Sequence, residues 1–111
     1  MAFGFGKPRH KEIDAQTLDA MLREGRALVI DVREADEFAA GHIPGAVNMP
    51  LSDFRPSRLP QAEGKTLVLN CLGGKRSGMA LEKCGLAQAE VDTHLADGFG
   101  AWTAARLPVE R

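Results

Sequence analysis

The chain has little of several features that mark large classes of proteins. It has only two cysteines in 111 residues, so no disulfide framework is indicated. Its formal net charge is −1, with 14 Lys and Arg against 15 Asp and Glu, which argues against the basic surface that general nucleic-acid binding needs. No apolar run approaches the ~18 residues of a membrane-spanning helix. We therefore expect no nucleic-acid partner and no membrane partner.

The N-terminal segment also lacks a targeting pattern. Residues 1–11 contain no basic stretch followed by an apolar run, so they do not resemble a signal peptide. We expect a flexible leader over residues 1–11, a single domain over residues 12–111 and, by default, a cytoplasmic location. There is no internal repeat and no low-complexity tract.

What the chain does contain is an alternation of strand and helix patterns. Nearly continuous apolar runs at residues 27–32 and 66–70 are typical of strands buried on both faces. We expect further strands at 46–48 and 90–95, and helices at 14–25, 34–40, 77–83 and 98–106. Pro56 leaves 51–58 as a turn or two of helix at most. This order predicts an α/β fold with a mainly parallel central sheet, in which ligands bind beyond the carboxyl ends of the strands.

The most informative residue is Cys71, which follows the second buried strand directly. Gly73 and Gly74 come next and can take the positive φ values that an anion-binding loop of backbone amides needs. Lys75 and Arg76 then precede a helix. Nearby cations and a helix N-terminus lower the pKa of a thiol, so this arrangement predicts a reactive thiolate at Cys71. The alternative is a buried structural cysteine followed by an ordinary turn.

Several other polar residues are interpreted as structural. Asp31 and Arg33 alternate at a strand end and point to the same side, and we expect Arg33 to pair with Glu37 and fix a loop. His42 lies in a turn, where a lone histidine more often makes a structural hydrogen bond than acts as a base. Cys84 lies on the apolar face of a predicted helix and is expected in the core.

No metal or cofactor is predicted. His10, His42 and His94 have no paired spacing with either cysteine, which argues against a zinc site. Gly74-Lys75 is weakly similar to a nucleotide-binding phosphate loop. However, Arg76 replaces the required Ser or Thr, and Leu69 stands where the first glycine belongs.

Three separate segments resemble the rhodanese homology domain. The first comprises Asp31-Val-Arg-Glu34, Glu37-Phe38 and Gly41-His-Ile-Pro-Gly-Ala46. The second, Cys71-Leu-Gly-Gly-Lys-Arg-Ser77, is similar to the family's active-site loop C-x-x-G-x-R-S. The third comprises Asp97-Gly-Phe-Gly-Ala-Trp102 and the ending Leu107-Pro-Val-Glu110. The segments occur in consistent order from about residue 13 to 110.

The resemblance implies a compact α/β fold with helices on both faces of the sheet, and a sulfurtransferase that carries sulfur as a cysteine persulfide. Cys71 would be the sulfur carrier. The donor would be thiosulfate or another sulfane-sulfur compound, and the acceptor a thiol, cyanide or a protein thiol. The residues expected to form the substrate-binding loop are Leu72, Gly73, Gly74, Lys75, Arg76 and Ser77. Of these, Arg76 and Lys75 would attract the donor anion, and Ser77 would donate its hydroxyl to the sulfur or cap the helix.

Two other functions stay open at this point. Cysteine phosphatases and arsenate reductases also place a cysteine between a strand and an anion-binding loop, and the phosphatases resemble H-C-x-x-x-x-x-R. Here Asn70 replaces the histidine, and Arg76 comes one residue too early. The second alternative is a non-catalytic binding or regulatory module on the same fold.

Overall fold

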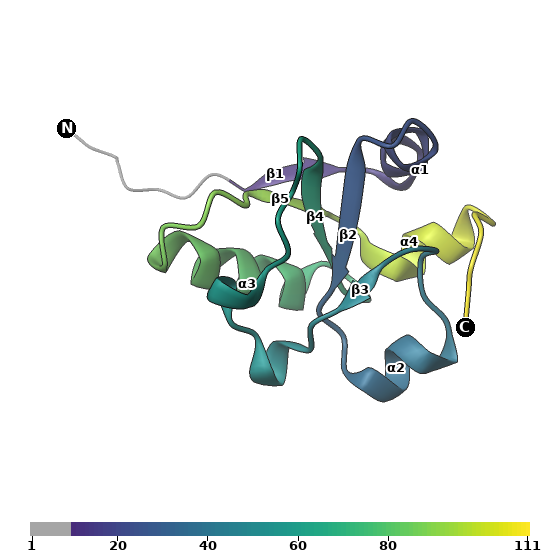
Figure 1. The fold of residues 1–111 in the computed structure, drawn as a ribbon. Helices are drawn as coiled ribbons and strands as arrows, with labels where there is room; N and C mark the ends of the chain where they lie inside the picture. Colours follow the sequence, from purple (N-terminus) through teal and green to yellow (C-terminus); the bar gives the residue numbers. More distant parts are fainter. Residues whose placement is uncertain (1–9) are drawn as a thin grey trace.

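A five-stranded parallel sheet forms the centre of the structure, a computed structural model that describes residues 10–111 (Figure 1). The strands are β1 (Lys11–Ile13), β2 (Ala27–Asp31), β3 (Val47–Asn48), β4 (Thr66–Asn70) and β5 (Thr93–Leu95). Their order across the sheet is β1-β5-β4-β2-β3, and all four neighbouring pairs are parallel. The mainly parallel sheet predicted from the sequence is confirmed.

Helices cover both faces of this sheet. They are α1 (Ala15–Arg23), α2 (Ala35–Ala40), α3 (Lys75–Leu86) and α4 (Gly98–Ala104), with short 3-10 helices at Leu51–Asp53 and Pro56–Arg58. In Figure 1, α3 lies on one side of the sheet and α4 on the other. The expected α/β fold with helices on both faces is therefore correct.

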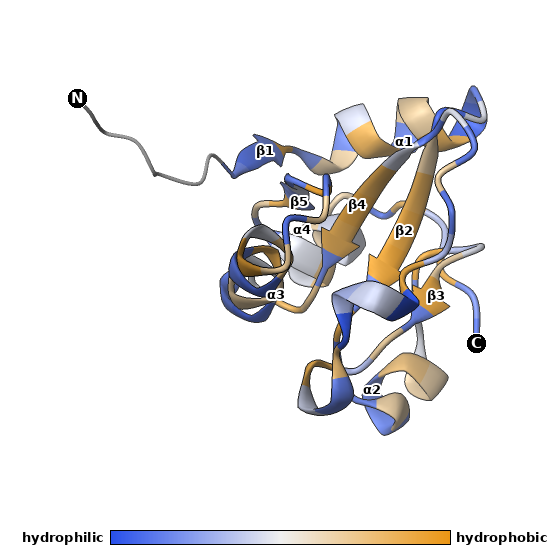
Figure 2. Ribbon diagram, turned by 60° about the vertical axis from the view of Figure 1, so that its left-hand side comes forward, coloured by the Kyte–Doolittle hydropathy of each residue, from blue (hydrophilic) through white to orange (hydrophobic). Residues whose placement is uncertain are grey.

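The apolar runs of β2 and β4 explain this two-sided packing. Successive side chains of a strand point to opposite faces. Val29 and Val68 accordingly join a core with Leu18 and Trp102 from α1 and α4. On the other face, the side chains that pack with α3 are Ile30 and Leu69 from the strands and Leu81 and Cys84 from the helix. Figure 2 shows β2 and β4 as the hydrophobic centre of the molecule. The two central strands, buried on both faces, therefore anchor the loops that follow them at the carboxyl edge.

Some element boundaries differ from those predicted. Strand β1 was not expected, and its first residue, Lys11, had been assigned to the leader. The rest of that segment, residues 1–9, lies outside the described residues. Helix α3 begins at Lys75, two residues before the predicted start, and it continues past Gly85 to Leu86. Ser77 is consequently the third residue of the helix, and Gly74 occupies the capping position that Ser77 was a candidate for.

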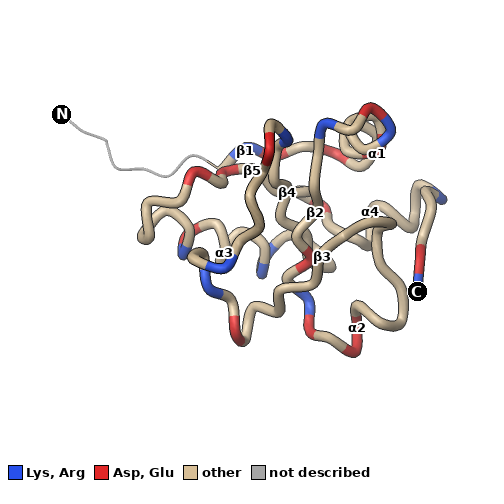
Figure 3. Tube along the Cα trace, viewed as in Figure 1, with Lys and Arg blue, Asp and Glu red and all other residues tan. Residues whose placement is uncertain are grey.

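Charged residues of both signs are spread around the described part of the chain (Figure 3). Within residues 10–111, no helix is long and apolar enough to cross a bilayer.

Candidate active site

Cys71 lies at the carboxyl end of β4, with 1% of its surface exposed. The loop that follows it is held against the start of α4 by two backbone hydrogen bonds. The Phe99 amide donates to the Cys71 carbonyl at 2.7 Å, and the Gly100 amide donates to the Leu72 carbonyl at 3.0 Å. Gly98 makes this approach possible: it has φ +67°, and a Cβ there would collide with the Leu72 carbonyl. Helix α4 thus holds the backbone that directly follows the thiol.

Two backbone amides point at the sulfur of Cys71. The Gly74 N–H donates to Sγ at 3.1 Å, and the Ser77 N–H donates to it at 3.3 Å. Both belong to the N-terminal end of α3, where the helix carries about half a positive charge from its aligned peptide dipoles. The loop therefore presents fixed partial positive charge to whatever species the sulfur forms.

Only one of the two loop glycines has the backbone conformation expected of both. Gly74 has φ +102°, and a Cβ there would collide with the Ala96 carbonyl. Gly73 does not have a φ in this left-handed range, and a Cβ on it would meet open space. The expectation that both glycines take positive φ is wrong for Gly73, because a single left-handed residue is enough to turn the chain into α3.

These contacts determine the ionisation of Cys71. Burial on its own raises the pKa of this thiol, because a thiolate loses its hydration. The amide and hydroxyl of Ser77, followed by the amides of Gly74 and Gly73, outweigh burial and lower the pKa of Cys71 below its ordinary value. These donors therefore shift the ionisation of Cys71 towards the thiolate, the nucleophilic form of cysteine.

Arg76 makes a bidentate ion pair with Glu37 of α2. Its Nη1 and Nη2 atoms lie 2.7 and 3.1 Å from the two carboxylate oxygens, and both side chains are about one-third exposed. The Arg76 guanidinium lowers the pKa of Glu37 from 4.5 to about 2. Lys75 and Leu72, by contrast, are exposed at the surface of the loop.

The sequence assigned the wrong partner to Glu37. Arg33 does not pair with it: the Arg33 Nη2 lies 2.9 Å from Asp31 Oδ2 and donates to the Gly41 carbonyl at 2.7 Å. The Arg33 guanidinium also lies over the Phe99 ring, 4.3 Å from its centre. Asp31 and Arg33 are both buried, so their structural interpretation agrees with the geometry, although the partner differs.

Sequence reasoning missed His94 as a neighbour of the loop. This histidine of β5 is 4% exposed, and its Nδ1 lies 2.7 Å from the Ser77 hydroxyl, which in turn is 3.6 Å from the Cys71 sulfur. The only signal in the sequence was a histidine in the middle of a predicted strand. Its contact with Ser77 depends on the packing of α3 against β5, which spacing alone does not reveal.

A comparison with families of known proteins decides which fold family this is. A family model described as the rhodanese-like domain matches residues 14–105. The chain belongs to the rhodanese-like domain family. The match includes the Cys71 loop, Glu37 and His94, and it confirms the resemblance drawn from the sequence.

Relatives of this rhodanese-like domain include proteins named as sulfurtransferases. An uncharacterized Synechocystis protein, slr1261, is 45% identical over 96 residues, which are 86% of this chain and 54% of that protein. The human thiosulfate:glutathione sulfurtransferase is 35% identical over 79 residues, 59% of this chain and 69% of that protein. A crystal structure of a Pseudomonas aeruginosa thiosulfate sulfurtransferase has a TM-score of 0.77 at 33% identity, covering 93% of this chain and 20% of that one. This chain thus spans about half the length of the Synechocystis relative.

The other cysteine and the turn histidine of this rhodanese-like domain have the environments predicted for them. Cys84 is fully buried in the core beneath α3, and burial raises the pKa of its thiol. The His42 ring stacks on Phe38, with its Nδ1 at 2.7 Å from the Phe38 carbonyl. Both residues therefore contribute to the packing of the fold. The pKa of the Cys84 thiol is raised, whereas that of the Cys71 thiol is lowered.

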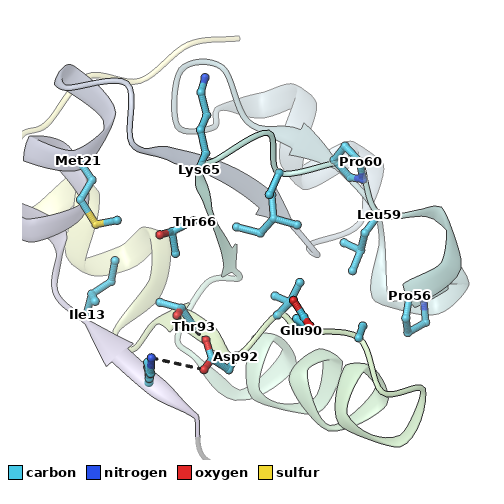
Figure 4. Close-up of a pocket in the computed structure, with 15 residues that line it drawn as sticks. Ile13, Met21, Pro56, Leu59, Pro60, Lys65, Thr66, Glu90, Asp92 and Thr93 are labelled. Carbon is cyan, nitrogen blue, oxygen red and sulfur yellow. Dashed lines mark hydrogen bonds and ion pairs between the residues drawn. The ribbon is translucent and has the colours of Figure 1, made fainter.

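A hollow of about 710 Å³ lies at the other end of the sheet (Figure 4). Thr66 and Thr93, the first residues of β4 and β5, line it together with Leu59, Pro60 and Met21. Since Cys71 follows the last residue of β4, the length of this five-residue strand, about 16 Å, separates the thiol from the hollow. The hollow is therefore separate from the Cys71 loop.

Proposed function

We propose that this rhodanese-like domain is a sulfurtransferase that moves sulfane sulfur from thiosulfate or a persulfide to a thiophilic acceptor through a persulfide on Cys71. The observation that carries the proposal is the pair of amides, from Gly74 and Ser77, directed at the Cys71 sulfur from a helix N-terminus. The names of the human and Pseudomonas relatives support the same reaction class.

The reaction has two displacement steps. The Cys71 thiolate attacks the outer sulfur of thiosulfate, a new S–S bond forms, and the S–S bond of the donor breaks as sulfite leaves with the electron pair. An acceptor thiolate or cyanide then attacks the terminal sulfur of the persulfide. The S–S bond to Cys71 breaks, and Cys71 leaves as a thiolate, ready for the next cycle.

The loop suits an anionic sulfur at each stage. The thiolate and the persulfide both carry negative charge, and backbone amides stabilise that charge with little reorganisation. Lys75 and Arg76, the first two residues of α3, supply the positive side chains of the loop, and these attract the donor anion and assist the departure of sulfite. Because Glu37 holds the Arg76 guanidinium by two hydrogen bonds, Arg76 is restrained next to the loop.

Steady-state kinetics with thiosulfate and cyanide tests this proposal. One thiolate serves both substrates in turn, so the mechanism is ping-pong, and double-reciprocal plots should be parallel when both substrates are varied. Cys71→Ser should abolish turnover, whereas the matched variant Cys84→Ala should retain most of it. Intersecting lines, or an active Cys71→Ser protein, would exclude a Cys71 persulfide as the sulfur carrier.

A further inference from the structure

A line of polar atoms runs from Cys71 through Ser77 to His94 and ends at Glu12. The Cys71 sulfur is 3.6 Å from the Ser77 oxygen, which is 2.7 Å from Nδ1 of His94. On the far side of the ring, Nε2 lies 3.6 Å from Oε2 of Glu12 on β1. Ser77 and His94 are both buried, which shields the Cys71–Ser77–His94 contacts from water, whereas the Glu12 side chain is exposed. The reaction described above uses neither His94 nor Glu12.

The hydrogen bonds from Cys71 to Ser77 and from Ser77 to His94 run in the same direction, whereas Nε2 of His94 lies near Glu12 without a hydrogen bond to it. The Nε2 atom of His94 faces a carboxylate, which favours the ring proton on Nε2 and leaves Nδ1 as an acceptor. The Ser77 hydroxyl has a single proton, and Nδ1 is its nearest acceptor. The Gly74 carbonyl is farther away, at 3.1 Å, and already accepts the Gly78 amide. With its proton directed at His94, the Ser77 oxygen can accept the thiol proton of Cys71.

We propose that Ser77 and His94 form a pathway that accepts the proton of Cys71 when its thiol ionises. The thiol proton passes to the Ser77 oxygen while the hydroxyl proton of Ser77 passes to Nδ1 of His94. The products are a thiolate at Cys71, a Ser77 hydroxyl that now donates to the sulfur, and an imidazolium at His94 facing the Glu12 carboxylate. The step is a proton transfer, with no oxidation or reduction. His94 touches no reacting atom, so it is a positioning residue that acts through Ser77.

The surroundings of His94 are consistent with this role. The titratable groups that face the ring are Glu12, His10 and, beyond Ser77, Cys71. Burial lowers the pKa of His94, which favours the neutral ring, the form in which Nδ1 can accept a proton. The Glu12 carboxylate and the new thiolate both favour the imidazolium that follows. The His10 ring, 6.0 Å away, opposes it when charged.

The inference rests on the proposed role of Cys71, and its test requires no sulfur transfer. The rate at which iodoacetamide alkylates Cys71 is measured by peptide mapping from mildly acidic to alkaline pH. In His94→Asn the side-chain amide occupies the place of Nδ1 and still forms hydrogen bonds, but it cannot accept a proton. We expect the alkylation midpoint, the pH at which the rate reaches half its maximum, to rise by about one pH unit. This is the usual effect of losing an adjacent opposite charge.

Two further variants make the result specific. Ser77→Ala should raise the midpoint in the same direction, and the double variant should shift it no more than the larger single change, because the two residues act in series. His42→Asn replaces a buried histidine that hydrogen-bonds the Phe38 carbonyl, and it should leave the midpoint unchanged. An unchanged midpoint in His94→Asn, or additive shifts in the double variant, would overturn the proposal.

A second measurement covers the case in which the His94 variant does not fold. The His94 ring is titrated by NMR in the unaltered protein and in Cys71→Ser, which cannot form the thiolate. Its pKa should be about one unit lower in Cys71→Ser, because the imidazolium loses its partner. Equal pKa values in the two proteins would overturn the pathway. A protein that shows this coupling but transfers no sulfur would contradict the proposed function alone.

Discussion

The Arg76 guanidinium binds both carboxylate oxygens of Glu37, at 2.7 and 3.1 Å, although the two residues are 39 positions apart. This ion pair connects the loop after Cys71 to helix α2. It also changes what Arg76 contributes, because part of its charge is already neutralised before any donor arrives. Variants of this pair therefore distinguish the contribution of the Arg76 charge from that of the backbone amides around Cys71.

Arg76→Ala should lower the rate of sulfur loading from thiosulfate by about one to two decades, the usual effect of a side chain that contacts a developing anion. Alkylation of Cys71 by neutral iodoacetamide should fall much less, because the amides of Gly74 and Ser77 stay in place.

Glu37→Gln should reduce the rate of sulfur loading by a smaller factor, since Arg76 keeps its charge but loses the ion pair that restrains it. Arg23→Ala removes an equal charge from an exposed side chain of α1, which pairs with Asp19, and is the control. Equal losses in loading and alkylation would mean that Arg76 acts on ionisation or loop folding.

The same ion pair should make part of the stability depend on acid pH. The Arg76 guanidinium lowers the pKa of Glu37 from 4.5 to about 2, so the pair stabilises the fold above about pH 4.5 and loses this effect as pH falls towards 2. Because the pair is one-third exposed, we expect Glu37→Gln to cost about 0.5–1 kcal/mol at neutral pH. Urea unfolding at several pH values should show this difference shrinking below pH 4.5. A difference that is constant with pH would contradict the pairing.

The two adjacent glycines provide a matched test of the loop. Gly74→Ala should destabilise the fold by about 1–3 kcal/mol, because φ +102° is strained for alanine and the new Cβ would collide with the Ala96 carbonyl. It should also slow alkylation of Cys71. Gly73→Ala should be tolerated, since its Cβ would meet open space. Thermal unfolding and alkylation of both variants check this, and equal effects at the two positions would contradict the loop geometry.

The short loop should also discriminate against phosphate esters. Arg76 follows Cys71 by five residues, one fewer than in the phosphatase pattern. The Ser77 amide donates directly to the Cys71 sulfur at 3.3 Å. We therefore expect little hydrolysis of p-nitrophenyl phosphate. A Cys71-dependent phosphatase rate comparable with the rate of sulfur transfer would favour the phosphatase alternative.

Patterns within single segments were enough to predict most of the fold. The apolar runs of β2 and β4 identified the two central strands, since a strand covered on both faces needs apolar residues at nearly every position. Strand β1, Lys-Glu-Ile, is short and largely exposed at a sheet edge, so it has almost no hydrophobic pattern. It forms because β5 provides a pairing partner, which is information that lies elsewhere in the chain.

The same distinction holds for the candidate site. Cys71, its loop and its place after a strand could be read from local spacing. The partners of the loop could not. Proximity in sequence indicated Arg33 as the partner of Glu37, but the Arg33 side chain is buried and pairs with Asp31. Glu37 pairs instead with Arg76. His94 meets Ser77 only because α3 packs against β5.

The central claim is that Cys71 carries sulfur, and intact mass spectrometry tests it most directly. The protein is incubated with thiosulfate alone, desalted and weighed, then treated with a reducing thiol or cyanide and weighed again. We predict a species heavier by one sulfur atom that forms in the Cys84→Ala variant, is absent in Cys71→Ser and disappears after the acceptor is added. An unchanged mass with thiosulfate, or a sulfur adduct that persists in Cys71→Ser, would contradict it.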